Sequence, residues 1–534
     1  MQRCIRVLFF LSPLLLLIAF GSTGSAQNPY TPTPQFCADP KVSTFCPIIP
    51  GNIGDDQALK NGVGYQGLVN RHPQSPAGDV QTPFDNLSWQ TFVALNWAAK
   101  SESAAPEQGL QSGAARVWQT WARPADVFKG SSVQADCKAA RIDDEPVFSF
   151  ASNGQGKEVA QHEEIIQAAT GDPLIDIDGN WTIYERRLNT IEIGYLQAPG
   201  GNKQWNLTTA AGQKAFLAAS PAQKVNFPDF TTTKSTGAIE IKAAWRVLDL
   251  KNHPDDAKRF YVIHALLAVA PDLVKPAGKL CAQVDLGLVA MHIIQKNAPL
   301  GNNLLPSWFW TTFEHVDNAP LAAAPCDVTK PTECKLGTVK SNPDLQSCPP
   351  LPPDASAPEY SYFTKTLRQL IPPLAVNQPP KASPGGKFYW SRQQPFAANY
   401  LKQVGGKAIG TQVARCWKIY ETTAELNRQW QDALAKVGSV FSHYMLVSTQ
   451  WGTTYETQMK LPLDAAPNLL SNTVVETYMQ NAYDPNDGFG TGSCVSCHHV
   501  ATFRKSKVST DFSFLPGMVQ SEQLRRAPLF QSAR

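Results

Sequence analysis

The sequence predicts an α+β fold, with a β-rich central region between helical flanks. Apolar and polar residues alternate over 239–246, a pattern typical of a strand with one packed face and one polar face. The stretches 260–267 and 284–294 are continuously apolar, as expected of strands at the centre of a sheet. Apolar residues recur every three or four positions over 411–437, which predicts a helix that ends before Gly438.

The composition allows a sizeable core and excludes several classes of protein. Of the 534 residues, 43% are hydrophobic and 10% are aromatic, which excludes global disorder. Charged residues make up 17% and the formal net charge is +3, so we expect no nucleic-acid partner. The length suggests several domains, or one large domain with insertions.

Residues 1–26 predict a cleaved signal peptide. Two arginines stand near its start, the apolar stretch 7–19 follows, and the small residues 24–26 form a cleavage site. The alternative is an uncleaved membrane anchor, which the shortness of the stretch and Pro13 disfavour. We therefore expect export to the periplasm or secretion, and no membrane span in the mature chain.

Three parts follow the signal peptide. Residues 27–318 contain most of the predicted strands and are expected to form a mixed, β-rich domain. Residues 319–410 are rich in Pro, Gly and Cys, which is typical of a connection. Residues 411–534 are expected to form a C-terminal helical segment that also contains the motif described below.

Caps, turns and shorter periodic stretches predict the remaining elements. In chain order these are a helix capped by Asp85 or Asn86, a helix near 158–169, a turn at 176–180, strands over 190–195 and 444–451, and a last helix over 468–480. Residues 176–180 also resemble a calcium loop, but Gly179 and Glu185 do not have EF-hand spacing. A turn between two strands is the preferred interpretation.

The motif that indicates chemistry lies near the C-terminus, where residues 492–499 are GSCVSCHH. Two cysteines separated by two residues and followed by histidine are the attachment signature of a c-type haem. Each thiol adds to one vinyl group of the porphyrin, and the next residue can bind the iron. We therefore predict one haem c per chain, with Cys494 and Cys497 as covalent attachment points and His498 as the proximal axial ligand.

Three other interpretations of the motif are less consistent with the sequence. A zinc site would need two more ligands, and no second paired-cysteine motif is present. A thioredoxin-like dithiol would follow a strand, whereas residues 484–493 form a loop rich in Gly, Pro and Asp. A simple disulfide would give His498 no role.

The second axial ligand is less well defined. Only 37 residues follow Cys497, so we expect a short attachment segment that is not a complete small cytochrome c domain and that borrows its pocket walls. Met518 is the candidate distal ligand, since a thioether would favour electron transfer. His499 adjoins the proximal ligand and cannot reach the opposite ring face. The other candidates are Met445, Met459, Met479 and His443, and an open sixth position is the remaining alternative.

The other cysteines predict disulfides. Cys4 belongs to the signal peptide, and if the motif serves a cofactor then eight cysteines remain, enough for four disulfides of unassigned pairing. They are Cys37, Cys46, Cys137, Cys281, Cys326, Cys334, Cys348 and Cys416. Such bonds are expected in an oxidising compartment.

Two further groups of residues are candidates for function. A basic tail could contact haem propionates or an acidic redox partner, and it comprises Arg504, Lys505, Lys507, Arg525 and Arg526. His292, Glu314 and His315, with His264, could form a second metal or acid–base site. The alternative for His292 is a hydrogen-bonded core histidine.

Several stretches together resemble the large single-haem proteins of bacterial periplasms that are labelled cytochrome c family proteins. The stretches are WQTFVALNW (89–97), PLIDIDGN (173–180), IEIKAAW (239–245), WTTFEHVDN (310–318), ETYMQ (476–480), CVSCH (494–498) and DFSFL (511–515). The resemblance implies haem binding and electron transfer, and it assigns Cys494, Cys497 and His498 without assigning a catalytic residue.

Three functions follow as hypotheses from these observations. The first is an exported c-type cytochrome that transfers electrons to or from a redox partner protein. The second is a haem-dependent oxidoreductase, peroxidase-like or oxidase-like, with an open sixth iron position. The third is a haem-based sensor or binding scaffold.

Overall fold

A computed structural model provides the structure of the chain. It describes residues 31–53, 81–100, 105–111, 113–128, 145–150, 163–164, 176–178, 180–198, 205–219, 224–269, 280–298, 307–328, 360–363, 413–451, 469–480, 492–503 and 506–519, and the single residues 137, 140, 142, 174 and 334. The predicted signal peptide and most of the predicted connection lie outside these residues.

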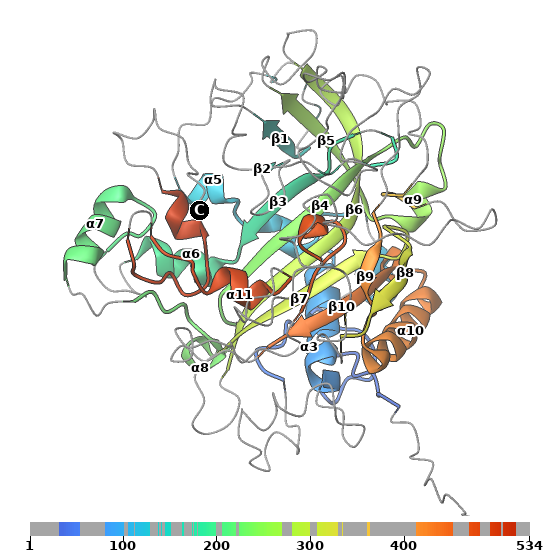
Figure 1. The fold of residues 1–534 in the computed structure, drawn as a ribbon, viewed down its shortest axis with the longest axis horizontal. Coiled ribbons are helices and arrows are strands. Elements are labelled where there is room, and N and C mark those ends of the chain that lie inside the picture. Colours follow the sequence, from blue (N-terminus) through green and yellow to red (C-terminus); the bar gives the residue numbers. More distant parts are fainter. Residues whose placement is uncertain are drawn as a thin grey trace, which may run out of the picture.

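Helices surround a curled mixed sheet, which confirms the predicted α+β class in its coarse form (Figure 1). The eight-stranded sheet has the order β1 (Val147–Phe150), β5 (Val262–Val269), β6 (Leu280–Asn297), β4 (Ile239–Leu248), β3 (Ile183–Leu188) and β2 (Glu163–Glu164). β7 (Ser307–His315) also pairs with β6 and connects β10 (Tyr444–Gln450) to the sheet. All of these pairs are antiparallel except that of β1 with β5. β8 (Leu321–Cys326) and β9 (Arg415–Trp417) form a separate parallel pair.

The helices are mostly short. They are α3 (Gln81–Leu95), α4 (Pro106–Gln111), α5 (Pro124–Val127), α6 (Thr190–Gln197), α7 (Ala210–Ala219), α8 (Phe230–Thr233), α9 (Asp256–Arg259), α10 (Glu421–Lys436) and α11 (Cys494–His498). The 3-10 helices are η1 (Val117–Thr120), η7 (Val440–His443), η9 (Thr477–Met479) and η10 (Leu515–Met518). Within the ranges that the structure describes, every helix is too short or too polar to cross a lipid bilayer.

One face of the sheet packs against α3 and α10 in a large aromatic core. The ring of Trp89 on α3 stacks on that of Trp430 on α10, with centroids 5.3 Å apart. Phe92 stacks on Phe313 of β7 at 4.0 Å. Ile241 and Ile293 of the paired strands β4 and β6 belong to the same cluster. The apolar half of the predicted strand alternation therefore lies on this face.

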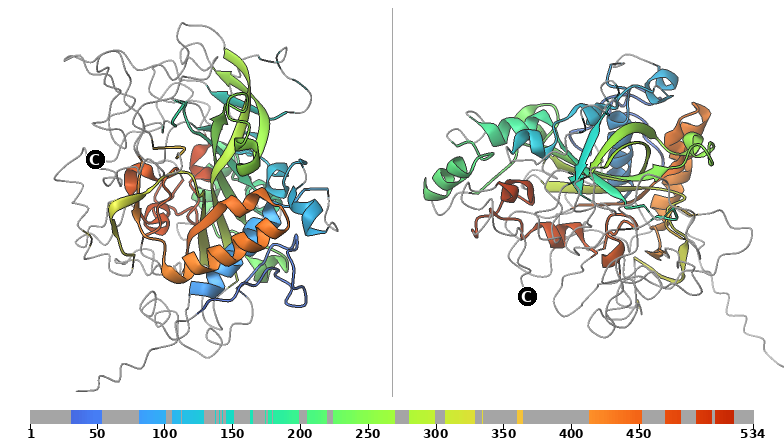
Figure 2. Two further views of the ribbon diagram at one scale, coloured as in Figure 1. Left: turned by 90° about the vertical axis from the view of Figure 1, so that its right-hand side faces the viewer. Right: turned by 90° about the horizontal axis from the view of Figure 1, so that it is seen from above.

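The opposite face of the sheet is polar and aromatic, and we call it the motif face. Residues that pair directly across antiparallel strands point to the same side, and such pairing links Lys242, His292, Thr312 and Ser448. The motif face comprises Glu240, Lys242, His292, Ile294, Lys296, Trp308, Trp310, Thr312, Glu314, Ser448 and Gln450. The C-terminal residues 469–480, 492–503 and 506–519 cover it, on the side of the sheet away from α3 (Figure 2).

The C-terminal part of the chain shares its core with the N-terminal part. β10 extends the sheet next to β7, and Tyr444 and Leu446 belong to the same cluster as Phe92 on α3. The strands predicted at 239–246, 260–267, 284–294 and 444–451 are confirmed as β4, β5, β6 and β10. The division into domains at 318 and 410 stays a prediction.

The described residues contain disulfides, as the cysteine count predicts. The bonded pairs are Cys37–Cys46, Cys137–Cys281 and Cys326–Cys334. Cys416 is also disulfide-bonded. Cys348 lies outside the described residues.

Several predicted elements differ from the observed ones. Residues 190–195 form helix α6 and no strand, because the Asn189 side chain accepts a hydrogen bond from the Glu192 amide and caps a helix there. The predicted helix over 468–480 is wrong apart from η9, since Asn472 bonds to the backbone of β7. α3 begins at Gln81, so Asp85 and Asn86 lie inside it.

Three further predictions had different outcomes. The helix predicted over 411–437 is α10, preceded by the short strand β9, and it is followed by Gly438 with φ of 69°. Of the helix predicted near 158–169, the described residues Glu163–Glu164 are instead strand β2. Residues 176–180 do form a turn, in which Asp176 accepts hydrogen bonds from the amides of Asp178 and Asn180.

The Phe313→Ala substitution tests the aromatic core. Phe313 is fully buried between Trp89 and Phe92, so we expect the free energy of unfolding to fall by about 3–5 kcal/mol, as is typical of a large aromatic truncation. Urea denaturation of the purified protein measures this change. Ile142→Ala, at a side chain that is 61% exposed, should change it by less than about 0.5 kcal/mol. Equal effects of the two substitutions would contradict this description of the core.

Candidate haem-attachment site

The motif predicted to attach haem forms the short helix α11, which is held on the motif face by β10. The Gln450 side chain accepts a hydrogen bond from the Val495 amide at 2.9 Å and donates one to the Ser493 hydroxyl at 3.0 Å. The Gly492 carbonyl accepts from the Leu470 amide at 2.6 Å. Val495 is fully buried among the side chains of the motif face. These contacts fix both ends of the first helical turn.

Cys494 and Cys497 lie on this helix, and both are outside the disulfides of the described residues. The Cys494 thiol donates to the Leu470 carbonyl at a sulfur–oxygen distance of 3.7 Å. Burial, with a contribution from the nearby Glu476, raises the pKa of Cys494 well above its usual value and that of Cys497 to about 11. Both thiols are therefore protonated at neutral pH, unlike the lowered-pKa thiol of a thioredoxin-like dithiol.

His498 ends the helix with its imidazole held in one orientation. Its Nδ1 lies 2.7 Å from the Phe512 carbonyl oxygen, which can only accept, so Nδ1 carries the proton. The centroid of its ring lies 5.6 Å from that of Trp310 and 5.0 Å from that of Phe514. Burial lowers the pKa of His498 to about 4. A neutral imidazole whose Nε2 lone pair is unprotonated is the form that binds a metal.

The loop that supplies the Phe512 carbonyl has an uncommon backbone conformation. Asp511 and Phe512 have φ values of 54° and 69°, in the left-handed region that L-residues rarely adopt. The buried Asp511 carboxylate accepts a hydrogen bond from the Phe227 amide at 2.7 Å and pairs with Lys296 of the motif face. These contacts hold the loop 509–515 against the sheet beside His498.

A hydrogen-bonded pair, His292 and Glu476, lies close to the motif. His292 Nε2 is 2.8 Å from a Glu476 carboxylate oxygen, and His292 Nδ1 contacts the Thr312 hydroxyl. Burial opposes ionisation of Glu476, but His292, Lys242 and the Asn472 amide outweigh it and lower the pKa of Glu476. The charges of Glu476 and Lys242 act on both Cys494 and His498, so this pair belongs to the surroundings of the motif.

The second site proposed from the sequence is not assembled. His292 and Glu314 share the motif face, but Glu314 pairs with Arg415 and accepts two hydrogen bonds from Thr473. His315 lies on the opposite face of β7, where its ring contacts the Arg259 carbonyl. His264 is exposed and pairs with Asp285. In the described part of the chain, no group of three or more such side chains is arranged to hold a metal ion.

The candidates for a sixth ligand are not brought to one place. The backbone of Met518 lies in η10, and its side chain is outside the described part, so its role stays a prediction. His443 lies beside His315, with ring centroids 6.1 Å apart, and thus away from α11. Met445 is paired with Glu314 on β7. Met459, Arg504, Lys505, Arg525 and Arg526 lie outside the described residues, and Lys507 is exposed.

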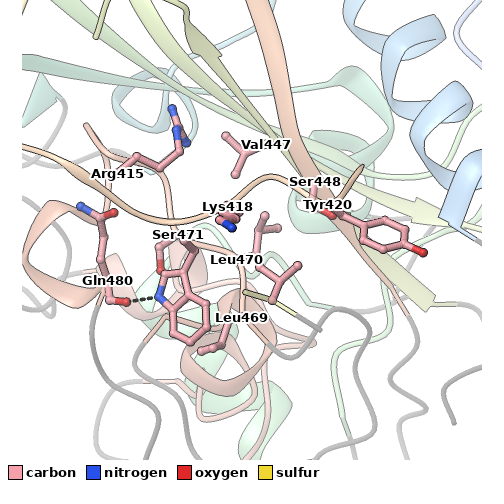
Figure 3. Close-up of a pocket in the computed structure, with 11 residues that line it drawn as sticks. Arg415, Lys418, Tyr420, Val447, Ser448, Leu469, Leu470, Ser471 and Gln480 are labelled. Carbon is pink, nitrogen blue, oxygen red and sulfur yellow. Dashed lines mark hydrogen bonds between the residues drawn. The ribbon is translucent and has the colours of Figure 1, made fainter. Parts of the chain in front are cut away.

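A small hollow of about 20 Å³ lies next to the motif, between β10 and the residues that precede α11 (Figure 3). Arg415, Lys418 and Gln480 line it together with Leu469 and Leu470. Since the Leu470 carbonyl also accepts the Cys494 thiol, the hollow and the motif share this residue. It is therefore a neighbour of the motif and not a separate site.

A pair of buried carboxyl groups, which sequence reasoning missed, lies near the loop that contacts His498. Glu192 of α6 and Glu240 of β4 interact closely, with exposed fractions of 0% and 8%. Burial, and then the neighbouring carboxyl group, raises the pKa of Glu192 well above its usual value, and burial raises that of Glu240. In the sequence, this pair was indicated only by glutamates that stand within an apolar alternation, as Glu240 does.

The residues present fit a covalently attached haem. Two protonated thiols and a neutral imidazole lie on one helix, and the imidazole is oriented through Nδ1 by a backbone carbonyl, as metal-binding histidines commonly are. The aromatic rings of Trp310 and Phe514 beside it provide an apolar wall. Comparison with known proteins adds no assignment, because no family model, no curated protein and no solved structure matches the chain.

The pH dependence of stability tests the buried carboxyl pair. A carboxyl group with a raised pKa in the folded state binds its proton more tightly than in the unfolded chain, so its burial costs stability as the pH rises above the usual value of 4.5. We expect the free energy of unfolding of Glu192→Gln to exceed that of the wild type, by a difference that grows as the pH rises from 5.

Urea denaturation at a series of pH values measures this difference. Glu107→Gln, at an exposed glutamate of α4, is the control and should show a difference that does not change with pH. A pH-independent difference for Glu192→Gln would contradict the raised pKa of Glu192 in the folded protein.

Proposed function

We propose that the chain is an exported c-type cytochrome that transfers electrons, with one haem c attached through Cys494 and Cys497. His498 is the proximal axial ligand. The observation that carries the proposal is the hydrogen bond from His498 Nδ1 to the Phe512 carbonyl, which leaves Nε2 unprotonated on the same helix as two thiols. A redox dithiol would not need this arrangement. A zinc site would need further ligands, and the described residues contain no group of three or more side chains arranged to hold a metal ion.

Different residues of the chain would attach the haem, orient its histidine ligand and limit the access of water. When bound, the haem would supply a one-electron redox centre. Cys494 and Cys497 would hold it covalently, and the Phe512 carbonyl would keep the His498 ring in the orientation for iron binding. Trp310 and Phe514 would limit the access of water to His498.

The C-terminal segment would form an incomplete cytochrome domain that borrows its pocket walls. The walls come from the motif face, where Trp310 contacts both His498 and Phe512 and Gln450 anchors α11. This supports the expectation that the 37 residues after Cys497 need the sheet to complete the pocket.

Export to the periplasm, or secretion, is part of the proposal. The disulfides of the described residues are compatible with an oxidising compartment. The motif requires attachment of haem outside the cytoplasm, and the predicted signal peptide would direct the chain there. We further propose a redox partner protein as the source or acceptor of the electrons.

A haem-dependent oxidoreductase with an open sixth position is the second candidate, and the His292–Glu476 pair favours it. A hydrogen-bonded histidine and carboxylate near the motif could accept or donate a proton during turnover. Both ring nitrogens of His292 already have partners, which argues against His292 as the sixth ligand.

Absorption spectra of the mature protein, made in a host that matures c-type cytochromes, test the proposal. We expect a reduced-minus-oxidised spectrum of one c-type haem per chain that survives acid–acetone extraction, because thioether links are covalent. The Cys494→Ala/Cys497→Ala variant should lose all extraction-resistant haem. Extraction-resistant haem in that variant would overturn the assignment.

The same preparation distinguishes the two candidate functions. An electron-transfer cytochrome with a bound methionine should bind carbon monoxide slowly, and its methionine–iron absorbance band should disappear in Met518→Leu. Rapid binding of carbon monoxide or cyanide to the wild type would favour the oxidoreductase with an open position.

A further inference from the structure

We propose that Lys296 and Asp511 are positioning residues for the axial histidine, acting through the backbone carbonyl of Phe512. The inference rests on the proposed function of His498. It assigns a role to two residues that neither touch the motif nor belong to it. Its basis is the path of contacts from β6 through the loop 509–515 to the imidazole.

The path of contacts ends at the Phe512 carbonyl, whose direction depends on a strained backbone conformation. The Phe512 oxygen accepts from His498 Nδ1 at 2.7 Å, and both Asp511 and Phe512 are left-handed, with φ of 54° and 69°. Two consecutive non-glycine residues rarely adopt this conformation without strong contacts to hold them. A relaxed loop would turn the carbonyl away from Nδ1.

Asp511 is the residue that holds the loop in this conformation. Its carboxylate is 1% exposed, and Oδ2 accepts from the Phe227 amide at 2.7 Å and from Lys296 Nζ. The loop also contacts the rest of the molecule through the Ser509 carbonyl, which accepts from the Val225 amide at 3.4 Å, and through the Phe512 ring, whose centroid lies 5.5 Å from that of Trp310 on β7. The Asp511 carboxylate adds a charged link between the loop and the sheet.

Lys296 supplies the positive charge that pairs with this carboxylate. Its side chain extends from β6 on the motif face, donates to Asn226 Oδ1 at 2.7 Å and places its ammonium 5.6 Å from the centre of the Trp308 ring. Glu192, Glu240 and Tyr195 face Asp511 from α6 and β4, and Arg186 faces Glu240 from β3. Without Lys296, a buried Asp511 would face two other carboxyl groups without its cation.

Loss of Lys296 should therefore change the tautomer of His498. In the wild type the Phe512 carbonyl selects the Nδ1–H form, whereas a relaxed loop would allow the Nε2–H form that predominates in free imidazole side chains. The Nδ1 hydrogen bond also increases electron donation by the ring, so its loss should raise the reduction potential of the attached haem.

The test measures the tautomer in the full-length mature chain without haem, made with Cys494→Ala and Cys497→Ala. Nitrogen-15 NMR of His498 in the parent should show the Nδ1–H form alone. Lys296→Met should lose this single form and show a mixture of both tautomers, and Lys296→Arg should keep the parent spectrum because it retains the charge. An unchanged Nδ1–H form in Lys296→Met would overturn the inference.

Two further variants separate positioning from loss of stability. Arg246→Met removes a buried cation that pairs with Asp178 at 2.6 Å elsewhere in the same sheet, and His498 should keep its tautomer. Asp511→Asn removes the charge with almost no change in shape, so it decides the question if Lys296→Met fails to fold. Asp511→Asn should give the same mixture of His498 tautomers as Lys296→Met. An unchanged Nδ1–H form would contradict the inference.

The haem-loaded protein provides an independent result. If the proposed function is right, Lys296→Met should raise the reduction potential relative to the wild type, and Lys296→Arg should not. If no haem is attached to the wild type while the tautomer changes as expected, the positioning role stands and the proposed function fails. Attached haem with an unchanged tautomer would support the proposed function and overturn the positioning role.

Discussion

Buried charges on one face of the central sheet need partners, and this need determines where the C-terminal segment lies. Lys296 pairs with Asp511, His292 with Glu476, and Glu314 with Arg415 and Thr473. An uncompensated buried charge costs several kcal/mol, so these pairs favour the docked arrangement in which each charge has its partner over other ways of burying the segment. A short segment with few helices is thus fixed mainly by polar contacts to strands that lie about 150–300 residues away in sequence.

The same contacts determine the chemistry available at the motif. Docking on the sheet partly buries Cys494, Cys497 and His498, and this burial raises the pKa of both thiols and lowers that of the imidazole. It also places the Phe512 carbonyl at His498 Nδ1. These are the states that thioether attachment and iron ligation require, so the packing that stabilises the segment also prepares the proposed site.

The sequence predicts those parts of the molecule that depend on local spacing. The period of β4 and the apolar run of β6 each belong to one short stretch, and each was sufficient to predict its strand. The Cys–x–x–Cys–His spacing is equally local, and the haem that it predicts stays a proposal. Contacts between distant residues were not accessible in this way. The hydrogen bond between Glu476 and His292 spans 184 residues, so no spacing indicates it. α6 was missed because its alternation resembles a strand, whereas the Asn189 cap favours a helix.

Peptide mass spectrometry tests the central claim most directly, namely that α11 is a haem-attachment site. The mature chain would be produced with the haem-maturation machinery of a bacterial periplasm, treated with a thiol-alkylating reagent and digested. The account predicts that the peptide containing residues 494–498 carries the mass of one haem and no alkyl group. The same peptide without haem, alkylated at both Cys494 and Cys497, would contradict it.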